Sequence, residues 1–269
     1  MTAVVLEGRA LHGGAPVRVT LSRAPGPVTL ARSGAACAVA ELEAVAGDRA
    51  TWVRGPGGVP EVATVEHLFS ALAGLSVYEG VRVEVDGAEL PVLDGGARAW
   101  VEALRAIDPP RGRPRLRVAK AGTFEVARSR YAFEVADAPF VEVDADFSDP
   151  RLVPRASWAG DESVYVATIA PARTFAFAAD VPDLAARGLG RGVDPESVVV
   201  IADGAILSAG PPFSPDEPAR HKLLDLLGDL YVRGGPPIGR VLARRPGHAA
   251  THVAVARALA EGVLVSAEE

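Results

Sequence analysis

The hydrophobic pattern divides the chain into short alternating segments and longer stretches with helical periodicity. Residues 17–21 alternate apolar and polar side chains, which predicts a strand that Pro25-Gly26-Pro27 breaks before it resumes at 28–30. The same criterion predicts strands at 81–85, 116–120, 123–127, 131–135, 141–145, 163–169, 197–202 and 238–243. Helical periodicity predicts helices at 64–76, 97–107, 181–187, 216–231 and 249–261, with Thr64 as the N-cap of the first and Glu66 in its first turn.

A proline-rich segment separates two regions of similar make. Residues 108–114 hold three prolines, which fit neither a helix interior nor an inner strand, so we interpret this segment as a domain linker. On each side of it, several predicted strands are followed by helices. We therefore predict an α+β fold with two similar domains, residues 1–110 and 115–269.

Composition narrows the class of protein. Hydrophobic residues make up 49% and charged residues 23% of the chain, which is ordinary for a globular protein. The net charge of −6, without any Lys/Arg run, argues against a nucleic-acid partner. The N-terminus resembles no signal peptide and no segment is long and apolar enough to cross a membrane, so we expect a cytoplasmic protein. Cys37 is the single cysteine, which excludes an intrachain disulfide.

The most informative residues for chemistry lie in the predicted helix 216–231. His221 and Asp225 are four residues apart and share one helical face. An exposed ion pair is the simpler interpretation, but Asp229 continues the series on a helix rich in leucine, which favours an inward-facing site. With His67 they make a plausible Zn²⁺ ligand set that leaves one position for water, and Glu66 is then a candidate general base.

A second histidine pair offers a rival ligand set. His248 and His252 also have i, i+4 spacing, but they lack the glutamate of a His-Glu-x-x-His motif, and spacing alone does not choose between the pairs. His248 follows a rigid Pro-Gly turn, which suits either a general acid or a helix-start residue bonded to its own backbone. Thr174 suits an oxyanion donor or a turn residue, and Lys222 is by default a surface lysine. No Gly-x-Gly-x-x-Gly segment or P-loop is present, so no nucleotide cofactor is implied.

Several segments together resemble the motifs of one family, in the same order along nearly the whole chain. They are Val65-Glu66-His67-Leu68 with Ala71 to Leu75, Leu90-Pro91-Val92-Leu93-Asp94-Gly95, Ala172-Arg173-Thr174-Phe175, Arg220 to Asp225 with Gly228-Asp229-Leu230, and Gly247-His248. The family is UDP-3-O-acyl-N-acetylglucosamine deacetylase, a zinc amidohydrolase that performs the committed step of lipid A synthesis in Gram-negative bacteria. Five separated motifs are a specific signal, unlike any one of them alone.

The resemblance implies a fold, a cofactor and residue roles. It implies two domains with helices packed on sheets, an active site at their interface, and zinc held by His67, His221 and Asp225. It implies Glu66 as general base, His248 as general acid oriented by Asp229, and Thr174 as oxyanion donor. Substrate contacts would come from Lys222, Phe175, Leu184 and Leu189, the last two in an apolar passage for the acyl chain.

The implied substrate is a UDP-linked acyl amino sugar, and acetate is released from its N-acetyl group. We also expect a monomer. Two other functions stay open at this stage: a non-catalytic relative that binds a nucleotide sugar, and a zinc amidohydrolase for a different N-acyl sugar. The chain departs from the family pattern at Ala176, where a glycine is usual, and in the segment from Ala10 to Gly14.

Overall fold

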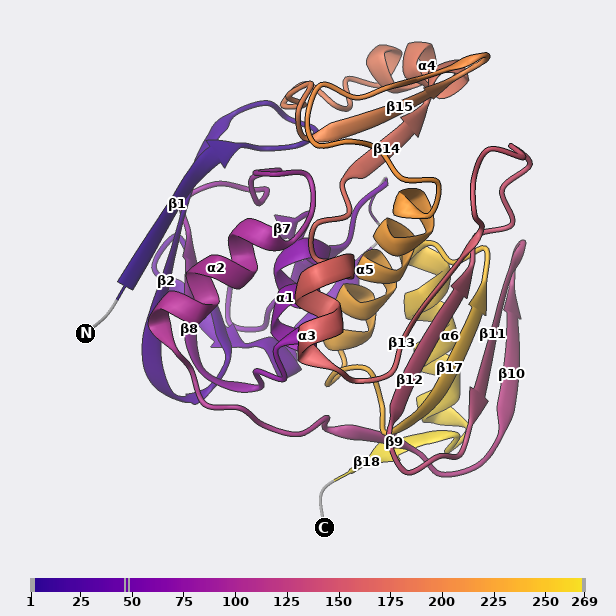
Figure 1. Ribbon diagram of the computed structural model, residues 1–269. Coiled ribbons are helices and arrows are strands. Elements are labelled where there is room, and N and C mark those ends of the chain that lie inside the picture. The colour runs from indigo at the N-terminus through magenta and orange to yellow at the C-terminus, as the bar shows by residue number, and fades with distance from the viewer. Residues whose placement is uncertain (1–2, 46, 48, 268–269) are drawn as a thin grey trace.

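Two five-stranded sheets dominate the structure and enclose two helices (Figure 1). The computed structural model describes residues 3–45, 47 and 49–267. In spatial order, the first sheet consists of β1 (Ala3–Arg9), β2 (Pro16–Pro27), β8 (Glu79–Val85), β3 (Thr29–Arg32) and β4 (Ala35–Ala38). The second consists of β10 (Gly122–Val126), β11 (Ser129–Glu134), β17 (Gly239–Arg244), β12 (Pro139–Asp144) and β13 (Arg155–Trp158).

The two sheets share one topology. In each, the strand that comes last along the chain occupies the centre, parallel to the third strand, while all other pairs are antiparallel. In each half one helix precedes the central strand and another follows it: α1 (Glu66–Gly74) and α2 (Arg98–Ile107) around β8, and α5 (Glu217–Tyr231) and α6 (His248–Ala260) around β17. The predicted α+β fold with two similar halves is confirmed, although the sequence shows no residue-level repeat.

The remaining elements form smaller units. One small antiparallel sheet consists of β5 (Glu43–Val45), β6 (Trp52–Arg54) and β7 (Val62–Ala63). Another consists of β9 (Leu116–Val118) and β18 (Leu264–Ser266). A three-stranded sheet at the top of Figure 1 consists of β14 (Thr174–Phe177), β15 (Val198–Ala202) and β16 (Ala205–Leu207), with α4 (Val181–Ala186) beside it. Short helices are η1 (Val39–Glu41), α3 (Glu162–Val164), η2 (Tyr165–Ile169) and η3 (Ala178–Asp180).

Burial explains why the strands and the central helices form where they do. In β2, Val17, Val19 and Leu21 are buried while Arg18 faces solvent, so one face of the strand packs on the core. In α1 every residue is buried, and α5 is buried over nearly its whole length. Helices that are covered on all sides lie inside a domain core, and α1 and α5 do so between the two sheets (Figure 1).

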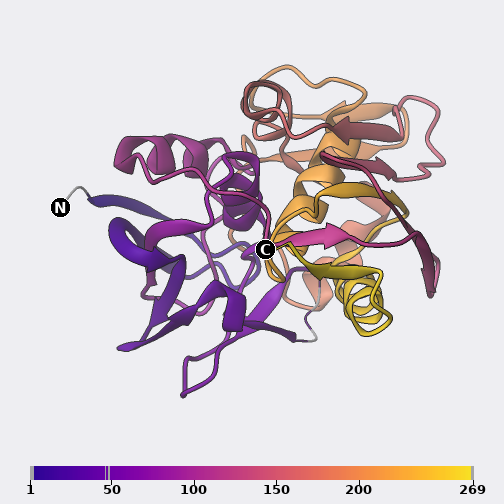
Figure 2. The same ribbon diagram turned by 90° about the horizontal axis from the view of Figure 1, so that it is seen from below.

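A proline-rich segment connects the two halves of the molecule. Residues 108–115 contain no helix or strand and run past the end of α1, where the Gly112 amide donates to the Ser76 carbonyl (2.7 Å). The two halves lie side by side when the molecule is seen from below (Figure 2). We propose that residues 1–110 and 115–269 are the two domains, since each range holds one complete five-stranded sheet. Within the described residues, no helix combines the length and the hydropathy needed to span a bilayer.

The prediction of a strand at 163–169 is wrong. This segment is helical, because the Asp161 carboxylate accepts a hydrogen bond from the Val164 amide (3.0 Å) and so caps a helical turn. Tyr165 and Ile169 then face the core together, and the Tyr165 hydroxyl donates to Ser70 of α1 (2.9 Å). The alternating pattern was therefore produced by a buried i, i+4 pair in a short helix.

Candidate active site

The start of α1 positions Glu66 and His67. β7 ends at Ala63, and Thr64 turns the chain with a positive φ of 58° before the helix begins at Glu66. Thr64 is therefore not the N-cap that we predicted, since the helix follows Val65 and the Thr64 hydroxyl donates to Glu89 (3.0 Å). Glu66 and His67 are only 2% and 4% exposed. Titratable side chains are seldom buried to this degree unless they have partners, so their burial indicates a functional site.

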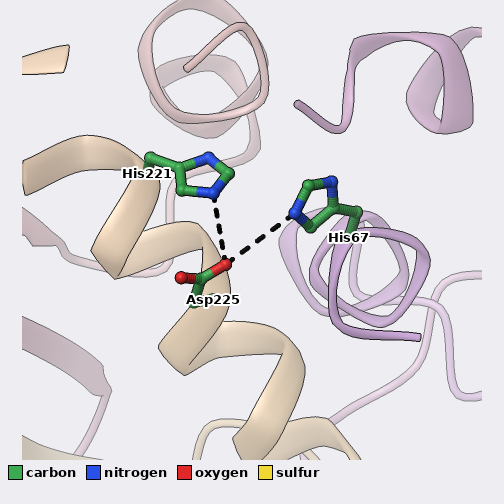
Figure 3. Close-up of side chains that lie close together, drawn as sticks. All are labelled: His67, His221 and Asp225. Atoms are coloured by element: carbon green, nitrogen blue, oxygen red, sulfur yellow. Dashed lines mark ion pairs between the residues drawn. The ribbon is translucent and has the colours of Figure 1, made fainter. Parts of the chain in front are cut away.

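Helix α5 brings His221 and Asp225 to the same place. The Nε2 atom of His221 lies 3.5 Å from Oδ1 of Asp225, and Nε2 of His67 lies 3.8 Å from the same oxygen (Figure 3). Their three potential ligand atoms lie within 4.8 Å of one another, and all three side chains are buried. Among the residues that the structure describes, this is the one group with such an arrangement, and His248 with His252 is not part of it.

Backbone carbonyls orient the two imidazoles. Nδ1 of His221 lies 3.0 Å from the carbonyl oxygen of Ala172, and His67 forms a hydrogen bond with the backbone of Gly96. A ring N–H held by a carbonyl leaves Nε2 as the free base, and metal-bound histidines are usually held by a backbone or carboxylate oxygen in this way. The donor set therefore fits a divalent metal ion such as Zn²⁺.

The protonation states also suit metal binding. Burial and the neighbouring His221 lower the pKa of His67 to about 3, and burial lowers that of His221, so both rings are neutral near pH 7. Burial opposes ionisation of Asp225, but the positive charges of Lys222 and, at a pH low enough to protonate them, of the nearby imidazoles outweigh it and hold the pKa of Asp225 well below the usual range. The Lys222 ammonium donates to Oδ2 of Asp225 (2.8 Å), which leaves Oδ1 facing the histidines.

Glu66 and His248 face each other beside this group. Burial raises the pKa of Glu66 to about 7. The backbone amide of Thr51 donates to its Oε2 (3.0 Å), and its Oε1 lies 3.9 Å from Nε2 of His248. A carboxyl group with a pKa near neutrality is well matched to exchange a proton at physiological pH.

Asp229 holds His248 from the other side. Nδ1 of His248 lies 3.0 Å and 3.1 Å from the two carboxylate oxygens of Asp229. Burial opposes the cationic form of His248, but the carboxylates of Asp229 and Glu66 outweigh it and raise its pKa to about 10. The ring is therefore an imidazolium at neutral pH, with Nε2–H directed toward Glu66. His252 is close to the same carboxylate, with its Nε2 3.7 Å from Oδ1 of Asp229.

A cavity of about 450 Å³ opens onto these groups. The predicted oxyanion donor Thr174 lines it, and so do the predicted substrate residues Phe175, Leu184, Leu189 and Lys222. The proton-transfer and ligand residues Glu66, His67, His221, Asp225 and His248 line it too. Thr174 begins β14, where its amide donates to the Gly95 carbonyl (2.8 Å), so the Asp94-Gly95-Gly96 turn connects the first half to this strand. The rings of Phe147, Phe175 and Phe177 pack edge to face along the apolar part of the wall.

Sequence reasoning missed some of the residues at this site. Thr51 contacts both Glu66 and Asp229. The side chains of His12 and Phe147 line the cavity. Arg49, which also lines it, forms an ion pair with Asp180 (3.5 Å). Thr51 and Phe147 carry no sequence signal, because each is a common residue type in an irregular region. Asp229 was expected to lie near His248, and it does so, but it is only 1% exposed and does not line the cavity.

Comparisons with known proteins agree with the motifs. A family model described as UDP-3-O-acyl N-acetylglycosamine deacetylase matches residues 1–261. The chain is similar to a UDP-3-O-acyl-N-acetylglucosamine deacetylase of Anaeromyxobacter dehalogenans, with 34% identity over 96% of this chain and 85% of the relative. A protein of the same name from Thermosynechococcus vestitus is 33% identical over 95% of this chain and 90% of the relative. One from Brucella melitensis is 33% identical over 96% and 93%.

Proposed function

The chain belongs to the UDP-3-O-acyl N-acetylglycosamine deacetylase family, and from that premise we propose a zinc-dependent deacetylation at the cavity just described. The substrate is UDP-3-O-acyl-N-acetylglucosamine, and the products are acetate and a free glucosamine amine, as lipid A biosynthesis requires. The convergence of His67 from α1 with His221 and Asp225 from α5 within 4.8 Å carries the proposal. A zinc ion held by these residues supplies Lewis acidity for the water and the amide carbonyl.

Glu66 and His248 divide the proton transfers. Glu66 accepts a proton from the water whose oxygen bonds to the acetyl carbon, which suits a carboxylate with a pKa raised to about 7. His248 donates its Nε2 proton to the amine nitrogen as the carbon–nitrogen bond breaks. Asp229 keeps that imidazole cationic and fixes its orientation through Nδ1. General acid and base groups of this kind contribute about 10²- to 10⁴-fold each to the rate.

The other cavity residues hold the substrate. The Thr174 hydroxyl donates to the amide oxygen as negative charge develops on it. Phe175 and Lys222 contact the sugar nucleotide, and the Lys222 ammonium lies 5.8 Å from the centre of the Phe175 ring. Leu184 and Leu189 line the apolar passage for the acyl chain. The monomeric state and the cytoplasmic location of the protein remain predictions.

The test combines metal analysis with acetate release from the UDP-linked substrate. We expect about one zinc per chain in the wild type and in Glu66→Ala, because Glu66 is not a ligand. Glu66→Ala should lose about 10²- to 10⁴-fold in turnover. Loss of metal in this variant would contradict its assignment as base. A wild-type protein that binds zinc and releases no acetate would favour a different N-acyl sugar or a binding function.

A further inference from the structure

Thr51 contacts both proton-transfer groups of the site. It precedes β6 and is 1% exposed. Its amide donates to Oε2 of Glu66 (3.0 Å), and its hydroxyl donates to Oδ1 of Asp229. Its carbonyl also accepts a hydrogen bond from the Val65 amide (3.4 Å), immediately before α1. The three polar groups of this buried residue therefore all bond to the elements that carry Glu66 and Asp229, which are α1 with the residue before it and α5.

Each contact restricts one carboxylate. The amide of Thr51 occupies Oε2 of Glu66, which leaves Oε1 toward His248 and the cavity. The hydroxyl bonds the same Asp229 oxygen that lies 3.0 Å from Nδ1 of His248, and the hydroxyl oxygen itself lies 3.2 Å from that nitrogen. A carboxylate held by two donors has little freedom to rotate, so the proton on His248 keeps one acceptor geometry.

His252 makes this restriction matter. Its Nε2 lies 3.7 Å from Oδ1 of Asp229 and 3.4 Å from the Thr51 hydroxyl, and its buried Nδ1 has no hydrogen-bond partner among the residues that the structure describes. Asp229 thus has a second imidazole within reach. Without the Thr51 hydroxyl, the carboxylate would be free to turn toward His252, and its contact with His248 would weaken.

We propose that Thr51 is a positioning residue, which holds Asp229 on His248 through its hydroxyl while its amide orients Glu66. This inference rests on the proposed function, which makes Glu66 the general base and His248 the general acid. The titratable groups that influence His248 are His12, Glu66, His67, His221, Asp225, Asp229 and His252. Of the interactions that these groups make with His248, the one with Asp229 is held in place by the Thr51 hydroxyl, so loss of the hydroxyl should weaken that interaction first.

The test compares Thr51→Val, which replaces the hydroxyl with a methyl group of similar size, with Thr51→Ser, which keeps the hydroxyl. Ser163→Ala is the control, because the Ser163 hydroxyl also donates to a carboxylate, that of Asp161 (2.6 Å), and neither residue lines the cavity. Zinc-loaded protein labelled with ¹⁵N in its five histidines reports the titration of His248 directly. Acetate release as a function of pH gives kcat, KM and the basic limb of the rate profile.

We expect Thr51→Val to lower the pKa of His248, and with it the pH at which the basic limb falls, by about 0.5 to 1 pH unit. We also expect it to lower kcat by about 10- to 100-fold with KM changed less than about threefold. Thr51→Ser should restore both properties, and Ser163→Ala should leave both unchanged. If Thr51→Val does not fold, Thr51→Ala removes the same hydroxyl and should give the same shift.

An unshifted His248 in Thr51→Val, a Thr51→Ser variant as impaired as Thr51→Val, or an equal shift in Ser163→Ala would each overturn the inference. The histidine titration needs no substrate. If the wild type releases no acetate from the UDP-linked sugar, the proposed function fails, while the titration still decides whether Thr51 holds Asp229 on His248.

Discussion

Gly228 of α5 lies directly against the backbone carbonyl of Glu66 in α1. A Cβ atom at Gly228 would come within 2.0 Å of that carbonyl oxygen. The two helices therefore meet backbone to backbone at this point, which only glycine allows. His67 follows Glu66, and Asp225 lies about one turn before Gly228. The close approach of the helices thus brings His67 within reach of Asp225.

Gly228→Ala should therefore weaken both folding and metal binding. Alanine is the better helix former by about 1 kcal/mol, so a helix that gained only propensity would become more stable. We expect the opposite, a destabilisation of at least about 1–3 kcal/mol, because α1 and α5 must separate. Denaturant unfolding and zinc affinity measure the effect. Gly112→Ala is the control, since its Cβ would meet the Tyr78 side chain at an ordinary 3.4 Å; equal stability of the two variants would refute the argument.

Metal content distinguishes the two histidine pairs. His221→Ala or Asp225→Ala should abolish stoichiometric zinc binding, since each removes one of three ligands. His252→Ala should keep normal zinc content, because its nearest charged neighbour is Asp229 and not the ligand group. Metal analysis after dialysis against a weak chelator makes the comparison. Zinc loss in His252→Ala would return the rival pair to consideration.

The pH dependence of turnover should report the partnership between Asp229 and His248. A general acid must be protonated, so activity is lost as pH rises through its pKa, which the carboxylates raise to about 10 against the opposing effect of burial. In Asp229→Asn the amide oxygen still accepts a hydrogen bond but carries no charge. The basic limb should therefore move down toward the ordinary value of about 6.5. Zinc content should be unchanged, and a basic limb that stays in place would exclude His248 as the acid.

The buried ion pair of Arg173 and Glu217 should support the loop that presents Thr174. Their side chains are 4% and 7% exposed, and Nε of Arg173 lies 2.8 Å from Oε1 of Glu217. Arg173→Met leaves that buried carboxylate without a positively charged partner, with the backbone amide of residue 173 still donating to it (3.1 Å), which costs about 3–5 kcal/mol. Urea unfolding should detect this loss and its recovery in Arg173→Met/Glu217→Leu.

The control for this prediction is an exposed pair. Arg18 and Glu7 lie 2.6 Å apart with side chains 60% and 63% exposed, so Arg18→Met should change stability little. If Arg173→Met were as mild as this control, the buried pair would not contribute to holding the loop.

Local periodicity in the sequence was sufficient for the long helices. The helices predicted at 97–107, 216–231 and 249–261 correspond to Arg98–Ile107, Glu217–Tyr231 and His248–Ala260. It failed at 163–169, where seven residues fit a strand and a short helix equally well. It also missed β1 and β14. Burial alternates along β1, but its apolar residues do not follow that alternation, and β14 is half-buried throughout.

The sequence by itself determined that His221 and Asp225 share one helical face, because that relationship depends on five consecutive residues of one helix. Only the tertiary structure decided that His67 joins them and that Thr51 contacts Asp229, 178 residues away along the chain. Such contacts depend on how α1, α5 and the loop before β6 pack together. Packing of this kind is set by the shapes and volumes of many side chains at once, and no short pattern in the sequence records it.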